Sequence, residues 1–373
     1  MKARPLFGIA IVQSSFCLAY WFLYRTWIDF WWPISSPAAF ALRIALAVLC
    51  VSFVVAMMLS FHFSNPLVRF TYWVAAVWLG LSNFLFVAAC LAWLTDLVLR
   101  LLFSANTHFA ARPYVAGVLL ISAIGAVICG MLNARSIRLR RITVSLPNLP
   151  ESWRGRSALL VSDLHLGHIN GAAFAKRIAA AARQLNPAIM FIAGDLFDGT
   201  RIDPASQAAP LSEISTPHGI FYVGGNHEEF GGAAHFEDAL RRIGIQVLHN
   251  ERVVIDGLQI IGVPYGHSTH LLPLRAFLEG LNLHNAPASI LLHHVPTQLP
   301  IAEHAGVSLQ LSGHTHGGQF FPFTLVTRRA FGKFTYGLQL FGAMQVYTSS
   351  GAGTWGPPMR VGTQPEIVLL TFA

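Results

Sequence analysis

Five short polar blocks in the second half of this 373-residue chain contain the residue types of a two-metal hydrolytic site. They combine carboxylate, imidazole and amide groups, which divalent ions such as Mn, Fe and Zn accept as ligands. Two such ions about 3.5–4 Å apart can clamp a phosphate and activate water for in-line displacement. One block alone is a weak signal, but five in order indicate metal-dependent phosphoester chemistry. The blocks are Asp163-Leu164-His165, Gly194-Asp195-Leu196-Phe197-Asp198, Gly225-Asn226-His227-Glu228, His293-His294-Val295-Pro296 and Gly313-His314-Thr315-His316.

Short apolar runs precede these blocks, and we predict that they are strands that position them. An Ala-rich helix is predicted between the first two, over residues 172–185. This alternation of strand and helix favours an α/β layered domain. Open α/β sheets place their sites at the carboxyl ends of strands, so we expect the blocks to meet along one edge. The predicted strands are Ala158–Ser162, Ile189–Ala193, Ile220–Val223, Leu258–Val263, Ile290–Leu292 and Leu309–Leu311.

Composition divides the chain into two parts of different character. The whole chain is 54% apolar and 11% charged, whereas ordinary soluble proteins carry about a quarter charged residues. Residues 1–134 contain seven Lys/Arg and two Asp/Glu, and residues 135–373 contain eighteen and fifteen. We therefore expect a transmembrane region over residues 1–134, a linker over 135–150 and a catalytic domain over 151–373.

Four stretches of the first part lack Lys, Arg, Asp and Glu for long enough to cross a bilayer, which takes about 20 residues. Charges inside a membrane mark transport paths, so their absence from these stretches favours an anchor over a lipid-presenting groove. Lys and Arg near the stretches favour the side that carries both termini by seven to four. This bias predicts a multi-pass protein of the inner (plasma) membrane with a cytoplasmic catalytic domain. The expected spans are residues 6–24, 44–62, 70–95 and 113–134.

The remaining part is only mildly basic, with a net charge of +3, and it contains no cysteine. Nucleic-acid binding usually needs a clustered basic face, so we expect no nucleic-acid partner. Without cysteine this part has neither a disulfide framework nor a thiolate metal site. Fourteen of the sixteen histidines lie after residue 134, as an imidazole-rich site requires. No obligate protein partner is indicated.

The order of the blocks resembles the calcineurin-like metallophosphoesterase superfamily. The motifs DxH, GDxxD, GNHE and GHTH carry the resemblance, which extends over about residues 150–373. With its apolar N-terminus the chain is similar to the membrane-anchored bacterial branch. That branch resembles the transmembrane metallophosphoesterases of animals and the UDP-2,3-diacylglucosamine pyrophosphatase-like enzymes. The resemblance implies a four-layer α/β/β/α sandwich after a four-helix transmembrane region, and two divalent metal ions.

The resemblance also implies a role for each residue of the site. His227 would approach the phosphate and donate a proton to the leaving oxygen, which is the task of a general acid. Seven other residues would be metal ligands. They are Asp163, His165 and His316 for the first ion, Asp195 for both ions, and Asn226, His294 and His314 for the second ion.

Three positions have two interpretations each. His294 is preferred to its neighbour His293 as a ligand, because the family pattern is His-x-Pro and adjacent strand residues point to opposite faces. Asp198 either orients the ligands or caps the next helix. Arg360 either contacts the substrate phosphate or pairs with Glu366.

Apolar and basic side chains are interleaved over residues 320–341. We hypothesise a loop that holds an acyl chain and pairs with a phosphate; a buried β-hairpin is the alternative. With the membrane region, this favours a lipid-linked phosphodiester or pyrophosphate as substrate. The other possible functions are hydrolysis of soluble phosphoesters, including cyclic nucleotides, and a non-enzymatic membrane scaffold or sensor. The complete set of ligands argues against a scaffold.

Overall fold

The computed structural model describes residues 3–31, 35–268 and 271–373. The chain divides into two compact units. One comprises Met1–Ser60 and Asn65–Met131, and the other Phe61–Ser64 and Leu132–Ala373. The second unit contains all five polar blocks, so the candidate site belongs to it alone.

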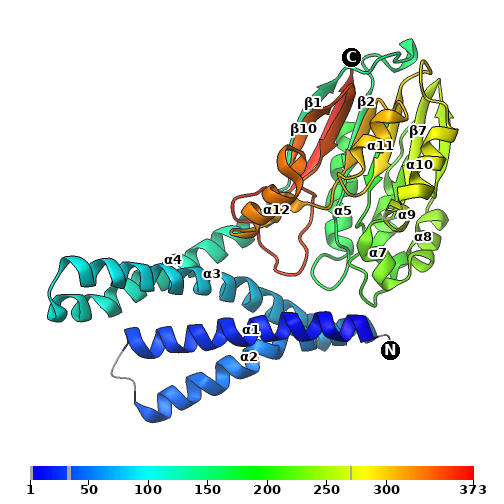
Figure 1. Cartoon of the computed structure of the whole chain (residues 1–373). Coiled ribbons are helices and arrows are strands. Elements are labelled where there is room, and N and C mark those ends of the chain that lie inside the picture. Colours follow the sequence, from blue (N-terminus) through cyan, green and yellow to red (C-terminus); the bar gives the residue numbers. More distant parts are fainter. Residues whose placement is uncertain (1–2, 32–34, 269–270) are drawn as a thin grey trace. The chain divides into compact units, whose positions relative to one another are not determined.

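The first unit is built from long helices, drawn in blue to cyan in Figure 1. Within the described residues, three helices are long and apolar enough to cross a membrane, rather than the four that we predicted. The first expected span, residues 6–24, falls in a helix, but its side chains before residue 10 lie outside the described part. The helices are α1 (Ala3–Phe30) and the three apolar ones, α2 (Ser36–His62), α3 (Pro66–Leu102) and α4 (Ala105–Arg135).

Helices α3 and α4 extend beyond the expected spans and bring charged groups into the helical unit. Asp96 is buried and accepts hydrogen bonds from Arg112 Nε at 2.8 Å and from Arg100 Nε at 2.7 Å. The prediction ended the spans at these charges, because it scored each charged residue singly. A charge that is paired and hydrogen-bonded is tolerated in apolar surroundings, and this cluster ties α3 to α4.

Twelve strands of the second unit form two six-stranded sheets (Figure 1). Their bounds are β1 (Arg138–Val144), β2 (Ser157–Val161), β3 (Ile189–Ala193), β4 (Ile220–Val223), β5 (Gln246–Val247), β6 (Glu251–Ile255), β7 (Leu258–Val263), β8 (Ser289–His293), β9 (Leu309–Ser312), β10 (Gly337–Phe341), β11 (Met344–Thr348) and β12 (Glu366–Phe372). The first sheet has the order β1-β12-β2-β3-β4-β5 and the second β10-β11-β9-β8-β7-β6. In each sheet the strands that precede the polar blocks run parallel, so their carboxyl ends share an edge.

Apolar side chains of both sheets pack together and form the central core. Leu160 and Phe191 from the first sheet and Ile260 and Leu311 from the second are fully buried there. Helices cover the outer faces: α5 (Ala172–Leu185) and α8 (Ala233–Arg242) on the first sheet, α10 (Leu271–Gly280) and α11 (Leu299–His304) on the second. The predicted four-layer α/β/β/α sandwich is therefore confirmed. Shorter helices are α6 (Pro204–Ala208), α7 (Asn226–Gly231), α9 (Tyr265–Ser268) and α12 (Phe323–Phe331).

Every strand predicted before a polar block is present. The bounds of α5, β3, β4 and β7 are as predicted, and the bounds of β2, β8 and β9 differ by one residue at one or both ends. These segments were predictable because apolar runs bounded by turn residues are a local signal.

The segment 135–150, predicted to be a linker, contains strand β1. This strand pairs in parallel with β12, and its basic side chains Arg138, Arg140 and Arg141 are exposed. Exposed charge suits a strand at the edge of a sheet, where it discourages pairing with other chains. The sequence did not indicate the strand, because its partner lies at the far end of the chain.

Candidate metal centre

The polar blocks converge at the carboxyl ends of β2, β3, β4, β8 and β9. Five of the seven predicted ligands have backbone angles in the left-handed region, which non-glycine residues rarely adopt. Such strain persists where the surrounding structure imposes it, and it concentrates at functional sites. These residues, with φ in parentheses, are Asp163 (53°), His165 (49°), Asp195 (48°), His314 (69°) and His316 (49°).

Two glycines allow the blocks to approach so closely. A Cβ atom added at Gly225 would lie 2.1 Å from Asp195 Oδ1, and one at Gly313 would lie 2.3 Å from Asp163 Oδ2. Both distances are far below van der Waals contact, so any side chain at these positions would displace a predicted ligand. The glycines of the GNHE and GHTH blocks are thus required by the site itself.

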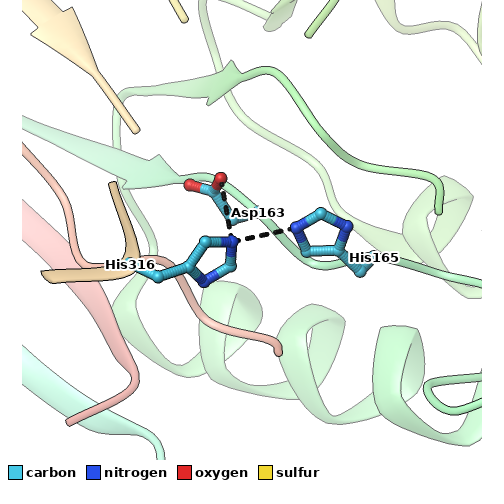
Figure 2. A group of neighbouring side chains, drawn as sticks. All are labelled: Asp163, His165 and His316. Atoms are coloured by element: carbon cyan, nitrogen blue, oxygen red, sulfur yellow. Dashed lines mark hydrogen bonds and ion pairs between the residues drawn. The ribbon is translucent and has the colours of Figure 1, made fainter. Parts of the chain in front are cut away.

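The first group of ligands contains Asp163, His165 and His316 (Figure 2). The Nε2 atoms of the two histidines lie 3.0 Å apart, and His316 Nε2 lies 3.5 Å from Asp163 Oδ1. All three residues are buried. Two imidazole nitrogens and a carboxylate oxygen directed at one point are the donor set of a borderline-hard divalent ion.

The second group contains Asp195, His294 and His314, with Asn226 beside them. His294 Nε2 lies 3.1 Å from Asp195 Oδ2, and His314 Nδ1 lies 2.9 Å from Asn226 Oδ1. Asp195 Oδ2 is also 3.9 Å from His165 Nε2 of the first group. Asp195 therefore lies between the two groups, where a carboxylate could bridge two ions.

The chemistry of this cluster fits divalent metal ions. His294 Nδ1 lies 2.7 Å from the carbonyl oxygen of Ala193, which can only accept, so Nδ1 carries a proton and Nε2 faces the cluster. In the described part of the chain that buried Nε2 has no partner with hydrogen-bond geometry. Fixing the far nitrogen of a histidine in this way orients the near one toward a metal.

The protonation of the ion-free cluster points the same way. Burial lowers the pKa of His294, but the adjacent Asp195 and Asp163 raise it more strongly, to about 10. Burial raises the pKa of Asp195, but His294 and His227 bring it below its usual value. The pair is thus ionised, with a proton on His294 beside the Asp195 carboxylate. A cation held between these two groups would replace that proton.

His293 and Asp198 each had two possible roles, as a ligand or not for His293, and in orienting ligands or capping a helix for Asp198. His293 points away from the cluster, with Nδ1 3.3 Å from Gln310 Nε2, whereas His294 points into it. Asp198 Oδ1 lies 3.5 Å from His165 Nδ1. Burial raises the pKa of Asp198 to about 7. Its position behind His165 is that of a group that orients a ligand.

His227 lies against both groups. Its backbone N–H donates to Asp195 Oδ1 at 3.0 Å, and its Nδ1 lies 3.1 Å from the Asp198 carbonyl oxygen. Since that oxygen only accepts, Nδ1 is the protonated nitrogen. Burial, followed by the charge of His165, lowers the pKa of His227. The arrangement leaves Nε2 for contact with a substrate. This nitrogen is an acceptor in the neutral ring, and a general acid needs a second proton there.

Glu228 has a structural role that sequence reasoning missed. Its buried carboxylate accepts hydrogen bonds from the N–H groups of Asp195, Phe197 and Gly225, at 3.2, 2.8 and 2.8 Å. It thereby joins the loop after β3 to the loop after β4. The GNHE motif contained the residue, but only the fold shows what it holds.

Arg360 does not form the predicted ion pair with Glu366 in the described part of the chain. It is fully buried, and its Nη atoms bond the carbonyl oxygen of His316 at 2.9 Å, His316 Nδ1 at 3.1 Å and Gly351 O at 3.2 Å. Glu366 instead accepts from Tyr336 and Tyr347. These bonds place Arg360 behind His316, a predicted ligand, and its contact with a substrate phosphate stays a prediction.

Comparisons with known proteins agree with a site that binds metal ions and cleaves phosphoesters. Residues 157–318 match the family profile described as calcineurin-like phosphoesterase. An uncharacterized metallophosphoesterase of Campylobacter jejuni is 30% identical over 74% of this chain and 71% of its own length. A transmembrane protein with metallophosphoesterase domain from Danio rerio is 30% identical over 78% and 70%. An uncharacterized metallophosphoesterase of Helicobacter pylori is 33% identical, and the chain spans only 58% of its length.

Solved structures are more distant. A dimetal phosphatase from Danio rerio aligns with 53% of this chain and 88% of its own, at 12% identity and a TM-score of 0.38. The identification therefore rests on the sequence relatives and on the site.

The chain belongs to the calcineurin-like metallophosphoesterase family, and it is a metal-dependent phosphoric ester hydrolase. Its apolar N-terminal helices and its transmembrane relatives associate it with membranes.

Proposed function

We propose that this protein is a membrane-anchored dimetal phosphoesterase that cleaves a phosphodiester or pyrophosphate bond of a lipid-linked substrate. Its activity would be like that of a UDP-diacylglucosamine pyrophosphatase. The observation that carries this proposal is a rim of aromatic side chains around His227 and His314.

Four aromatic rings make up this rim. The rings of Phe230 and Trp355 lie 5.5 and 5.8 Å from the His227 ring, and these side chains are 65% and 49% exposed. The rings of Tyr265 and Phe331 lie 6.3 and 6.1 Å from His314. Exposed aromatic surface costs free energy in water and favours contact with apolar groups. A substrate with an acyl chain would cover such a rim, whereas a small soluble phosphoester would not need it.

The predicted residues would have two roles in hydrolysis: seven would hold the metal ions and one would donate a proton. Two divalent ions, when bound, would clamp the phosphate and lower the pKa of the attacking water. The ions, for which we propose Mn, Fe or Zn, would be held by Asp163, His165, Asp195, Asn226, His294, His314 and His316. His227, when it also carries a proton on Nε2, would give that proton to the leaving oxygen and return to the neutral ring, and the Asp198 carbonyl would keep its ring in place through Nδ1. The buried surroundings of the cluster strengthen these electrostatic contacts.

For the location we propose a multi-pass protein of the inner membrane with its catalytic unit in the cytoplasm. The three apolar helices support a multi-pass protein, and the seven-to-four bias of Lys and Arg supports the orientation on the condition that α1 also crosses the membrane. Reporter fusions after Ala373 test the topology: a fluorescent protein should fold there, and a periplasmic alkaline phosphatase should stay inactive. The opposite pattern would refute it.

Turnover of three substrates by the full chain in detergent with Mn tests the substrate class. They are a UDP-linked diacyl sugar pyrophosphate, its deacylated analogue and bis-p-nitrophenyl phosphate. We expect the highest kcat/KM on the acylated substrate. Trp355→Ala should raise KM for it alone, whereas Leu272→Ala, an exposed apolar residue in α10, should change nothing. Equal turnover of the acylated and deacylated compounds would favour soluble phosphoesters. Bound metal without turnover of any substrate would favour the scaffold.

A further inference from the structure

A second cavity opens beside α12, apart from the metal cluster. Its volume is about 800 Å³, and its walls include Arg328, Lys333, Tyr336, Asn133 and Thr363. None of the seven predicted ligands, nor His227, lines it. The cavity is therefore distinct from the metal cluster, and the chemistry of its lining indicates which kind of ligand would fit it.

The charges of this cavity suit an anion. Arg328 and Lys333 are the two charged residues of its lining, which contains no Asp or Glu. Lys333 Nζ donates to the carbonyl oxygen of Leu340 at 2.9 Å, which uses one of its three protons. In the described ranges Arg328 forms no ion pair. Guanidinium and ammonium groups of this kind pair well with phosphate oxygens.

The helix that forms one wall has an exposed apolar surface. Phe323, Leu325 and Val326 of α12 are 48%, 59% and 60% exposed, and no residue of α12 is buried. The hypothesis of a buried β-hairpin over residues 320–341 is thus wrong for this part, although β10 does pair with β11. Exposed apolar side chains next to basic ones are the composition of a helix that lies in a membrane interface.

The cavity also contacts the last turn of a predicted membrane span. Asn133, two residues before the end of α4, donates from Nδ2 to the carbonyl oxygens of Arg360 and Thr363, at 2.9 and 2.8 Å. These bonds fix the wall of the cavity to that turn. A helix that crosses a bilayer ends near the lipid phosphates, and Asn133 belongs to the last turn of such a helix.

We propose that this cavity binds the headgroup of an anionic phospholipid of the surrounding bilayer. Arg328 and Lys333 hold the headgroup phosphate, and the exposed apolar side chains of α12 contact the acyl region. This lipid is a ligand and not the substrate, and its binding does not depend on which substrate the metal centre hydrolyses.

The test is a native mass spectrometry titration of the full chain in detergent with phosphatidylglycerol and with phosphatidylcholine of the same acyl chains. The Arg328→Gln/Lys333→Gln variant should bind phosphatidylglycerol at least tenfold more weakly, since each basic residue near a membrane surface contributes about fivefold. Arg329→Gln is the matched control, because this exposed neighbour on α12 does not line the cavity. It should bind like the native protein. Phosphatidylcholine should bind all three equally.

Two further measurements separate lipid from free phosphate and binding from folding. Leu325→Ser should weaken phosphatidylglycerol but not sn-glycerol 3-phosphate. All variants should hydrolyse bis-p-nitrophenyl phosphate at the native rate, which shows that the fold is intact. Unchanged phosphatidylglycerol affinity in the double variant, or an equal loss in Arg329→Gln, would overturn the proposal. Inorganic phosphate binding as tightly as the lipid would also overturn it.

Discussion

At the scale of single residues, the candidate site depends on which nitrogen of each histidine is protonated. Backbone carbonyl oxygens decide this for two of them. Ala193 O faces Nδ1 of His294, and Asp198 O faces Nδ1 of His227. In both residues Nε2 is consequently the nitrogen turned away from the backbone carbonyl, toward Asp195 and an ion in His294 and toward a substrate in His227. The two roles differ in position only, and substitutions can separate them.

His227→Asn should lower kcat by about 10²–10⁴-fold, because it removes the proton donor to the leaving group. The metal content, measured by mass spectrometry of the purified chain, should stay at two ions. His304→Asn, a change at an exposed histidine at the end of α11, should leave both quantities unaltered. Loss of metal from His227→Asn would instead make this residue a ligand.

Asp195→Asn should remove more than about 10³-fold of the activity, since a neutral amide cannot bridge two dications and several kcal/mol of charge stabilisation are lost. It should also lower the metal content below two ions per chain. Asp238→Asn removes the same charge from an exposed site in α8 and should have no effect. Native metal content in Asp195→Asn would contradict the bridging position.

At the scale of elements, the site is where loops from two sheets meet, and Glu228 at the start of α7 joins two of those loops. Burial and the charge of Asp195 raise the pKa of its carboxyl more than the N–H donors of Phe197 and Gly225 lower it, so that the pKa is about 8. Without the Glu228 carboxylate these buried N–H groups would lose their hydrogen-bond partner. The hydrogen bonds of Glu228 therefore stabilise the fold as well as holding the two loops in place.

Glu228→Gln should reduce the free energy of unfolding by about 1–3 kcal/mol, because an amide nitrogen cannot accept and leaves a buried N–H group unpaired. Thermal unfolding of the full chain in detergent measures this. Glu279→Gln, at a partly exposed position in α10, is the control and should shift the midpoint little. An unchanged midpoint for Glu228→Gln would show that the loops hold each other without these hydrogen bonds.

At the scale of the whole molecule, metal binding is coupled to protons and to folding. His294 carries a proton in the ion-free protein, since its pKa there is about 10. An ion must displace that proton, so binding releases it. The affinity for the metal ion therefore rises with pH as long as the pH is below that pKa.

Mn affinity should therefore increase by roughly tenfold between pH 6.5 and pH 7.5 for each proton released. Titration calorimetry in two buffers of different ionisation heat measures the number of protons. Removing metal with a chelator should also lower the unfolding midpoint, because an ion that binds only the folded state stabilises it by mass action. Affinity that is independent of pH would mean that His294 is neutral before the ion binds.

The sequence by itself determined the chemistry of this protein and the strands that present it. Residue type, order and the apolar run before each block are local properties, and together with the family resemblance they allowed Asp163, Asp195 and His294 to be named as ligands without a structure. The predicted α5 and β3 followed from the same local signals. The separation of an apolar N-terminal part from a catalytic part was also visible in the distribution of charge.

The tertiary structure alone decided which distant segments support that chemistry. Strand β1 exists because β12 pairs with it, and Arg360 lies behind His316 because the chain returns there after α12. The cavity beside α12 brings Asn133 to Lys333. These contacts join residues far apart in sequence, and no local periodicity encodes them. Such pairings depend on the packing of the whole fold, and for this reason they could not be predicted from local patterns in a single sequence.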